Sequence, residues 1–288
     1  MNSIAKKKVR ISDAIMYGLI YLCAGISVLL IVGIILYVFA KGFSQVNWEF
    51  LTTTTSILKG TVGIAGNILN TVYIIILTMF LATPIGVGAA IYLNEYAKPG
   101  RLVRMIELAT ETLSGIPSII FGMFGMMFFG TTLGLKYSIL TGTLTLTLMV
   151  LPLITRNTQE ALRTVPDSYR HGAVGLGAGK WYTIRTILLP SAMPGIITGV
   201  ILAIGRIVGE SAALLYTAGS SNLLPQSAKM YLDKILQPGG TLTIQLYLSA
   251  QDGEFDIAFG IALVLLVIVL VINMATKLLA KRFDVNRR

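Results

Sequence analysis

The chain has 288 residues, of which 55% are hydrophobic and 12% are charged, and its mean hydropathy is +0.77. Soluble domains carry about 25% charged residues, so this composition indicates that most of the chain lies in lipid. The single cysteine excludes a disulfide scaffold, and the lack of low-complexity tracts excludes collagen and disorder.

Six apolar stretches are long enough to cross a membrane, because a bilayer core about 30 Å thick needs roughly 20 residues of helix. Only one of them contains charged residues, namely Arg206 and Glu210. The predicted spans are residues 14–40, 60–94, 112–135, 137–155, 191–218 and 257–276. The pattern therefore predicts an all-α, polytopic membrane protein.

The first apolar stretch follows a basic segment and could be mistaken for a secretory signal. It is much longer than the 7–15 apolar residues of a signal peptide, so we expect it to stay as a membrane anchor. The predicted organisation is a basic tail at 1–13, a first transmembrane helix at 14–40, a five-helix core at 60–280 and a second basic tail at 281–288.

Basic residues gather on one side of this predicted topology. Of the 23 Lys and Arg residues, 17 fall at the two termini and in the loops after the second and fourth spans, and five fall in the other loops. Positively charged loops stay in the cytoplasm, so both termini are expected there. The net charge of +10 then reflects topology and contact with the lipid bilayer, and we expect no nucleic-acid partner.

The long inner loop 156–190 contains a glycine-rich run at 175–180. A phosphate-binding loop needs glycine where Val174 stands and Ser or Thr where Trp181 stands, so we do not expect this chain to hydrolyse ATP. His171 is the only histidine, which argues against a metal site or a serine–histidine–acid triad. We therefore predict no enzyme activity, no metal and no cofactor bound by this chain.

The same loop carries a spaced motif. Its members are His171, Gly172, Ala173, Gly177, Ile187, Leu189 and Pro190. The spacing resembles the cytoplasmic signature of ABC importer permeases, in which Glu and Ala occupy the places of His171 and Gly172. The resemblance implies coupling to a cytosolic ATPase, which uses ATP and Mg²⁺, through two short helices with a sharp bend at Gly177. Neutral His171 could not replace a glutamate that pairs with a basic group of that partner.

The fifth predicted span places an arginine inside an apolar helix. A charge at mid-membrane costs about 2.5–3.5 kcal/mol, so Arg206 should face protein or water, and Glu210 could neutralise it from one turn further on. One interpretation is a structural ion pair that ties this helix to a neighbour. The other is a guanidinium in the path of a phosphate-like oxyanion. The glycine pairs Gly195–Gly199 and Gly205–Gly209 should let neighbouring helices approach closely.

Three segments are similar to phosphate permeases of the PstA type: residues 204–215, 115–122 and 168–181. The resemblance extends from about residue 66 to the end of the chain. It implies that the substrate pathway includes Arg156, Arg206 and Glu210. Pro117 is expected to bend the third span around a cavity, with a simple packing kink as the alternative.

This resemblance also implies an architecture and an assembly. The fold would be that of MetI-like type I importer permeases in a prokaryotic inner membrane, with the first helix against the outside or a partner subunit. The expected partners are a PstC-type permease in a heterodimer, two copies of a PstB-type ATPase and an external PstS-type phosphate-binding protein. Importers of sulfate, molybdate or phosphonate remain the alternative. An intramembrane enzyme is disfavoured because the predicted spans contain no histidine–acid or paired-carboxylate cluster, and a passive channel would not need the coupling motif.

Overall fold

The structure is a computed structural model that describes residues 11–56, 60–225 and 227–283, so most of the two predicted basic tails (1–10 and 284–288) lies outside the described residues. Its main helices are α1 (Ile11–Gly42), α2 (Trp48–Thr52), α3 (Ala65–Ile91), α4 (Arg101–Gly115), α5 (Ser118–Gly125), α6 (Ile139–Arg163), α7 (Asp167–Gly175), α8 (Lys180–Thr183), α9 (Leu189–Val208), α10 (Ala212–Thr217), α11 (Ala228–Asp233), α12 (Leu242–Gln251) and α13 (Phe255–Phe283). Three π-helical segments extend or join them: Tyr92–Tyr96 after α3, Met126–Thr132 after α5 and Ile184–Leu188 between α8 and α9.

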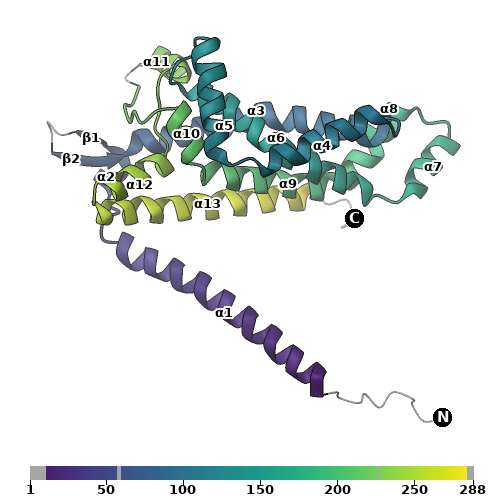
Figure 1. The fold of residues 1–288 in the computed structure, drawn as a ribbon, viewed down its shortest axis with the longest axis horizontal. Coiled ribbons are helices and arrows are strands. Elements are labelled where there is room, and N and C mark those ends of the chain that lie inside the picture. Colours follow the sequence, from purple (N-terminus) through teal and green to yellow (C-terminus); the bar gives the residue numbers. More distant parts are fainter. Residues whose placement is uncertain (1–10, 57–59, 226, 284–288) are drawn as a thin grey trace.

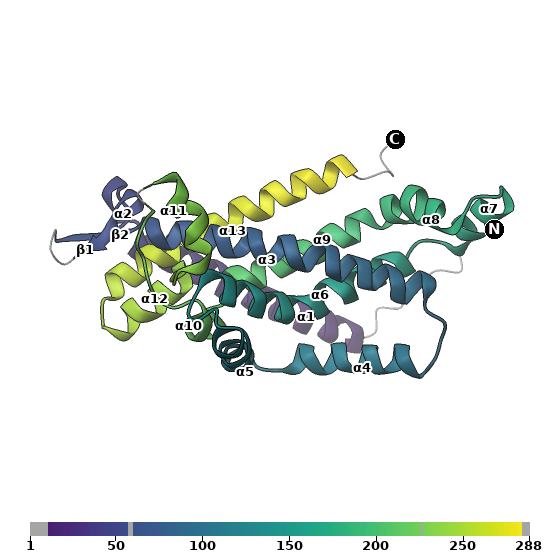
Figure 2. The ribbon, with the colours of Figure 1, turned by 90° about the horizontal axis from the view of Figure 1, so that it is seen from above.

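Helices α3, α6, α9 and α13 run along the long axis of the molecule and form its bundle (Figures 1 and 2). Their contact is apolar, with Leu146, Val150 and Ala203 fully buried. One end of the bundle holds α7 and α8 and is called the α7 end below. The opposite end holds the short antiparallel strands β1 (Thr54–Ser56) and β2 (Thr61–Ile64) and is called the hairpin end.

Five helices are long and apolar enough to cross a membrane, and they correspond to five of the six predicted spans. They are Ile15–Gly42, Ala65–Tyr96, Ile139–Arg163, Lys180–Val208 and Phe255–Leu278. Helix α6 does not stop at residue 155, where the fourth predicted span ends, and continues to Arg163. The first part of the predicted loop 156–190 is therefore helical and belongs to the bundle.

The third predicted span, 112–135, is not one straight helix. It consists of the end of α4, then α5 and its π-helical extension, and the two parts meet at an angle of 104°. Pro117 has no backbone N–H, and a proline disfavours helical geometry at the residue before it, so Ile116 is extended with φ −73° and ψ 131°. The bend expected at Pro117 is present, but it is a break between two helices. If this bent pair is counted as one span, the number of spans is six.

The fifth predicted span, 191–218, also ends too late. Helix α9 ends at Val208, and the short α10 follows after a three-residue break. The expectation that Glu210 lies one helical turn beyond Arg206 was therefore wrong. At the other end of this span, α9 begins further back than expected, because Ile184–Leu188 joins it to α8 without interruption.

Helix α1 extends away from the helix bundle (Figure 1). Among the described residues, α1 contacts the bundle near its C-terminal end. There Gly42 lies against the backbone of Phe259, and the ring of Tyr37 packs edge-on against the ring of Phe259, with 5.5 Å between the ring centroids. The apolar side chains along the remainder of α1 are exposed. This arrangement agrees with a helix that faces lipid or another subunit.

The hairpin end contains elements that the sequence reading missed. Besides β1 and β2, helix α12 packs on α13 and α3. The segment between α10 and α12 contains α11 and a short 3₁₀ turn, Lys234–Leu236. The amides of Asn67 and Asn70 on α3 both donate to the Gly240 carbonyl at 3.0 Å and hold the returning loop against the bundle.

Candidate functional site

A cavity of about 230 Å³ lies between α4, α6 and the last turn of α9, and it brings together two of the predicted pathway residues. Its lining is Thr110, Ser114, Met149, Pro152, Leu153, Arg156 and Arg206. Arg156 and Arg206 are 50 positions apart in the chain and come from different helices. We call this space the arginine cavity.

The local structure explains how charged side chains reach this place. The 104° break after α4 leaves α4 beside α6, with its polar residues Thr110 and Ser114 facing the cavity. Arg206 lies in the last turn of an otherwise apolar helix, and its side chain is exposed in the isolated chain. A charge in apolar surroundings needs a polar or wet environment, and the cavity supplies one.

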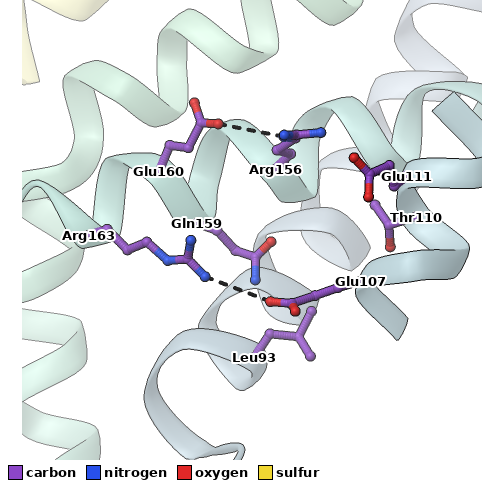
Figure 3. Close-up of a pocket in the computed structure, with 8 residues that line it drawn as sticks. All are labelled: Leu93, Glu107, Thr110, Glu111, Arg156, Gln159, Glu160 and Arg163. Carbon is purple, nitrogen blue, oxygen red and sulfur yellow. Dashed lines mark ion pairs between the residues drawn. The ribbon is translucent and has the colours of Figure 1, made fainter. Parts of the chain in front are cut away.

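A second cavity of about 250 Å³ shares Thr110 and Arg156 with the first (Figure 3). Its lining is Leu93, Glu107, Thr110, Glu111, Arg156, Gln159, Glu160 and Arg163. We call it the charged cavity, because two arginines face three glutamates there. The shared residues place the two cavities next to each other along α6.

Two ion pairs line the charged cavity. Arg163 Nη2 lies 3.8 Å from Glu107 Oε1, which links α6 to α4, and Arg156 Nε lies 3.6 Å from Glu160 Oε1 within α6. All four side chains are between 49% and 64% exposed, so each pair contributes about 1 kcal/mol or less. Gln159 lies between the two pairs (Figure 3).

The chemistry of these cavities suits an oxyanion. Guanidinium groups present planar forks of N–H donors that match the geometry of phosphate-like oxygens. The arginine cavity has no carboxylate in its lining, and Arg206 takes part in none of the ion pairs among the described residues, whereas Arg156 also lies 3.6 Å from Glu160. Within the described residues, no group of three or more His, Cys, Asp or Glu side chains is arranged to hold a metal ion.

The structure does not bring Glu210, the third predicted pathway residue, to either cavity. Glu210 is 9% exposed and follows the end of α9. One of its carboxylate oxygens accepts a hydrogen bond from the backbone N–H of Ala213 at 3.0 Å, at the start of α10. The ion pairs among the described residues include neither Glu210 nor Arg206, so the expected neutralisation of Arg206 by Glu210 is not observed.

The spaced motif lies at the α7 end and forms the predicted helix–bend–helix. Helix α7 ends at Gly175, the chain turns at Gly177 with φ +81°, and α8 begins at Lys180. A positive φ of this size favours glycine, so the bend depends on the residue type at this position. Both His171 and Gly172 are exposed, and a Cβ atom on Gly172 would have no neighbour within 4 Å.

The other motif residues fasten this loop to the bundle. Ala173 is 6% exposed, and Ile187 and Leu189 pack against a cluster that includes Leu162 and Leu188. Pro190 directly follows the π-helical segment Ile184–Leu188, which joins α8 to α9. The outer surface of the loop exposes large apolar side chains: Tyr169, Val174, Leu176, Trp181 and Tyr182. Such a surface is typical of a protein interface.

Arg170 fixes the loop to two helices, and the sequence reading missed it. Its guanidinium donates to Glu95 Oε1, to Asp167 Oδ1 and to the carbonyls of Leu162 and Val165, all at 2.9–3.0 Å. The hydrogen bond to Glu95 raises the pKa of Arg170, and burial opposes this rise. Asp167, three positions earlier, is a local signal, but Glu95 lies 75 positions away and no pattern in the sequence pairs the two.

The charged cavity was missed for a different reason. Arg156, Glu160 and Arg163 are spaced at i, i+4 and i+7, which places them on one face of a helix. Because the fourth span was predicted to end at residue 155, these three residues were not recognised as one face of a helix. Glu107 and Glu111 show the same spacing on α4. A reading that continued both helices would have found the two charged faces.

Together, the long apolar helices, the arginine-lined cavity between them and the bent loop with its exposed apolar surface define a polytopic membrane transport protein. The family described as the binding-protein-dependent transport system inner membrane component matches residues 82–287. The chain therefore belongs to the inner-membrane permeases of binding-protein-dependent transporters. It is a transport subunit without a cofactor or catalytic site of its own, and it works with an ATPase and a substrate-binding protein.

Individual relatives span most of the chain. The probable ABC transporter permease protein YqgI of Bacillus subtilis is 36% identical over 281 residues, which cover 93% of this chain and 95% of that protein. The phosphate transport system permease protein PstA 2 of Mycobacterium bovis is 31% identical over 286 residues, covering 99% and 94%. PstA 1 of Mycobacterium tuberculosis is 36% identical over 211 residues, covering 72% and 66%.

Solved structures support the fold. A permease chain of a bacterial alginate ABC transporter superposes with a TM-score of 0.70 at 15% identity, covering 95% of this chain and 96% of that chain. A chain of the inward-facing MetNI methionine transporter gives a TM-score of 0.62 at 20% identity, covering 76% and 95%. The predicted MetI-like type I permease fold is confirmed.

Proposed function

We propose that this permease passes inorganic phosphate through the membrane, with Arg156 and Arg206 as the residues that receive the anion. The observation that carries the proposal is that these two arginines line one cavity with no carboxylate in its lining. Several relatives of the chain are phosphate transport permeases by name, which supports phosphate as the substrate.

The arginine cavity can replace part of the hydration shell of the anion. Phosphate carries one to two negative charges at neutral pH, and two guanidinium groups from different helices can donate to several of its oxygens at once. The hydroxyl groups of Thr110 and Ser114 donate to the Ile106 and Glu111 carbonyls at 2.7 Å. The arginines are therefore the main donors of this cavity.

One copy of the chain supplies half of the pathway, and a PstC-type permease supplies the other half in a heterodimer. Of the two copies of a PstB-type ATPase, one binds the exposed loop of this chain at the α7 end, and a PstS-type protein delivers phosphate at the hairpin end. The α7 end then faces the cytoplasm, in agreement with the distribution of basic residues. The start of α1 and the end of α13 both point toward this end, which supports cytoplasmic termini (Figures 1 and 2).

A second candidate is an importer of another oxyanion, namely sulfate, molybdate or phosphonate. Two arginines recognise any tetrahedral oxyanion, and the relative YqgI is named as a permease without a substrate. Uptake of labelled phosphate in the presence of each competing anion distinguishes these candidates. Phosphate import predicts that only phosphate itself competes at low excess.

The decisive variants are Arg206→Gln and Arg156→Gln in the complete transporter. Each should abolish phosphate uptake by cells while the variant subunit still copurifies with its partners. Arg104→Gln is the matched control, because Arg104 is an exposed arginine on α4 and lines neither cavity. Unchanged uptake by Arg206→Gln would remove this residue from the pathway.

A further inference from the structure

The charged cavity contains groups that the proposed pathway does not yet use. Arg163 lies seven positions beyond Arg156, about 10 Å further along the same face of α6 and toward the α7 end. Three carboxylates line the same cavity, from Glu107, Glu111 and Glu160. Arg156 lines both cavities, so an anion held in the arginine cavity already contacts a residue of the charged cavity.

The charge balance changes along this route. In the arginine cavity, two arginines stand without any lining carboxylate. In the charged cavity, two arginines face three glutamates, and each of its arginines has a carboxylate within 4.0 Å. An anion that enters the charged cavity must therefore compete with side-chain carboxylates for the same guanidinium groups.

The geometry of the pairs allows this competition. The distances of 3.6 and 3.8 Å are longer than charge-assisted hydrogen bonds, and both pairs are about half exposed. Weak, solvated pairs exchange one anionic partner for another at little cost. Glu107 and Glu111 also belong to α4, which has no buried residue and is separated from α5 by a sharp break, so the cavity wall that carries them is loosely packed.

We propose that Arg163 is a third anion-binding residue of the translocation path, and that Glu107, Glu111 and Glu160 act as built-in counter-ions that weaken anion binding in the charged cavity. The affinity for the oxyanion then falls from the arginine cavity toward the α7 end, which favours release on that side. The inference rests on the proposed function, since it assigns the second half of the same route. Both the arginine and the carboxylate positions then set the affinity for the anion along the route.

The test measures binding of labelled inorganic phosphate to the complete, nucleotide-free transporter in lipid nanodiscs, without the external binding protein. Glu107→Gln removes one counter-ion and keeps the shape of the side chain, so phosphate should bind up to about fivefold more tightly. Arg163→Gln should weaken binding, and the double variant should lose the gain of Glu107→Gln. Glu254→Gln is the control, because Glu254 is exposed and lines neither cavity.

The outcomes separate this inference from the proposed function. Unchanged phosphate binding by Glu107→Gln, in a variant with an unchanged melting temperature, would overturn the counter-ion role. If Glu107→Gln strengthens phosphate binding equally in the presence of Arg163 and in the Arg163→Gln background, Arg163 is not part of the path. In both cases, loss of phosphate uptake in Arg206→Gln would leave the proposed function standing. If wild-type uptake instead proves insensitive to Arg206 and Arg156, the proposed function fails first.

Discussion

Arg170 offers the sharpest test of how the exposed loop is fastened to the bundle. We predict that Arg170→Met loosens the segment 164–183 without unfolding the transmembrane helices. The wild-type guanidinium makes four hydrogen bonds at 2.9–3.0 Å and its side chain is 21% exposed. Its partner Glu95 is 8% exposed and keeps only the amide of Asn94 as a donor when Arg170 is lost.

The size of the effect follows from these contacts. Removing one member of a buried ion pair costs about 3–5 kcal/mol, because the other charge stays buried without its partner. Arg170 is about one-fifth exposed, so we take the lower end, about 3 kcal/mol. At 1.36 kcal/mol per factor of ten, the protection of amides in this segment should fall roughly 100-fold.

The assay is hydrogen–deuterium exchange on the purified complete transporter, read by mass spectrometry over residues 164–183 and over α6. Arg185→Met is the matched control, since Arg185 is exposed and takes part in none of the side-chain hydrogen bonds or ion pairs found among the described residues. The double variant Glu95→Leu with Arg170→Met should regain part of the protection, because no charge is left buried. Equal exchange in Arg170→Met and Arg185→Met would refute the role of Arg170 as a fastening residue.

Three further predictions concern other parts of the fold. A Cβ atom on Gly199 would lie 2.7 Å from Asn157 Cβ. Gly199→Ala should therefore lower the free energy of unfolding by about 1–3 kcal/mol and lower the melting temperature. Gly205→Ala is the control and should not lower the melting temperature, because its Cβ atom would meet no described residue within 4 Å. His171→Glu with Gly172→Ala restores the residues of the family signature at two exposed positions, and the variant should melt no lower than the wild type and copurify with the ATPase. Burial lowers the pKa of Lys234. Between that lowered pKa and the ordinary 10.5, the folded state therefore binds fewer protons than the unfolded state. The thermal stability of the wild type should rise relative to that of Lys234→Met as pH increases through this window, and a constant difference between the two proteins would contradict the prediction.

The number and type of the long helices could be predicted from hydropathy, but their ends could not. Charged residues suggested that the fourth span stops at residue 155, yet α6 continues because its buried face continues. Thr158, Ala161 and Leu162 are all less than 9% exposed, so the apolar stripe extends past Arg156. A membrane helix can continue beyond the apolar core of the bilayer. The first charged residue in the sequence marks where the helix leaves that core, and it does not mark where the helix ends.

Close helix contacts were predicted in part. Of the two glycine pairs on the fifth span, Gly195 and Gly199 do meet α6, where added Cβ atoms would lie 2.6 Å from Ala161 and 2.7 Å from Asn157. Gly205 faces open space, and Gly209 contacts only its own helix. Spacing alone cannot tell these pairs apart, because which face of a helix meets a neighbour is decided by tertiary packing.

The candidate site, too, could be predicted only in part. The intramembrane Arg206 could be singled out because a charge there is costly, and the family resemblance added Arg156. Their common cavity depends on the 104° break that places α4 beside α6, and Pro117 signalled a bend without its size. The pairings of Arg163 with Glu107 and of Arg170 with Glu95 join residues more than 50 positions apart, and a single sequence contains no signal for them.

The pairing of Arg170 with Glu95 links the loop at the α7 end to a short segment that also lines the charged cavity. Arg170 holds Glu95, and Glu95 belongs to the π-helical segment Tyr92–Tyr96 at the end of α3. Leu93 of the same segment lines the charged cavity. A displacement of α7 therefore reaches the wall of that cavity through one ion pair and two residues of backbone. Glu107 of α4 lines the same cavity and lies 3.8 Å from Arg163, so a shift of the wall that carries Leu93 would change the space around this pair.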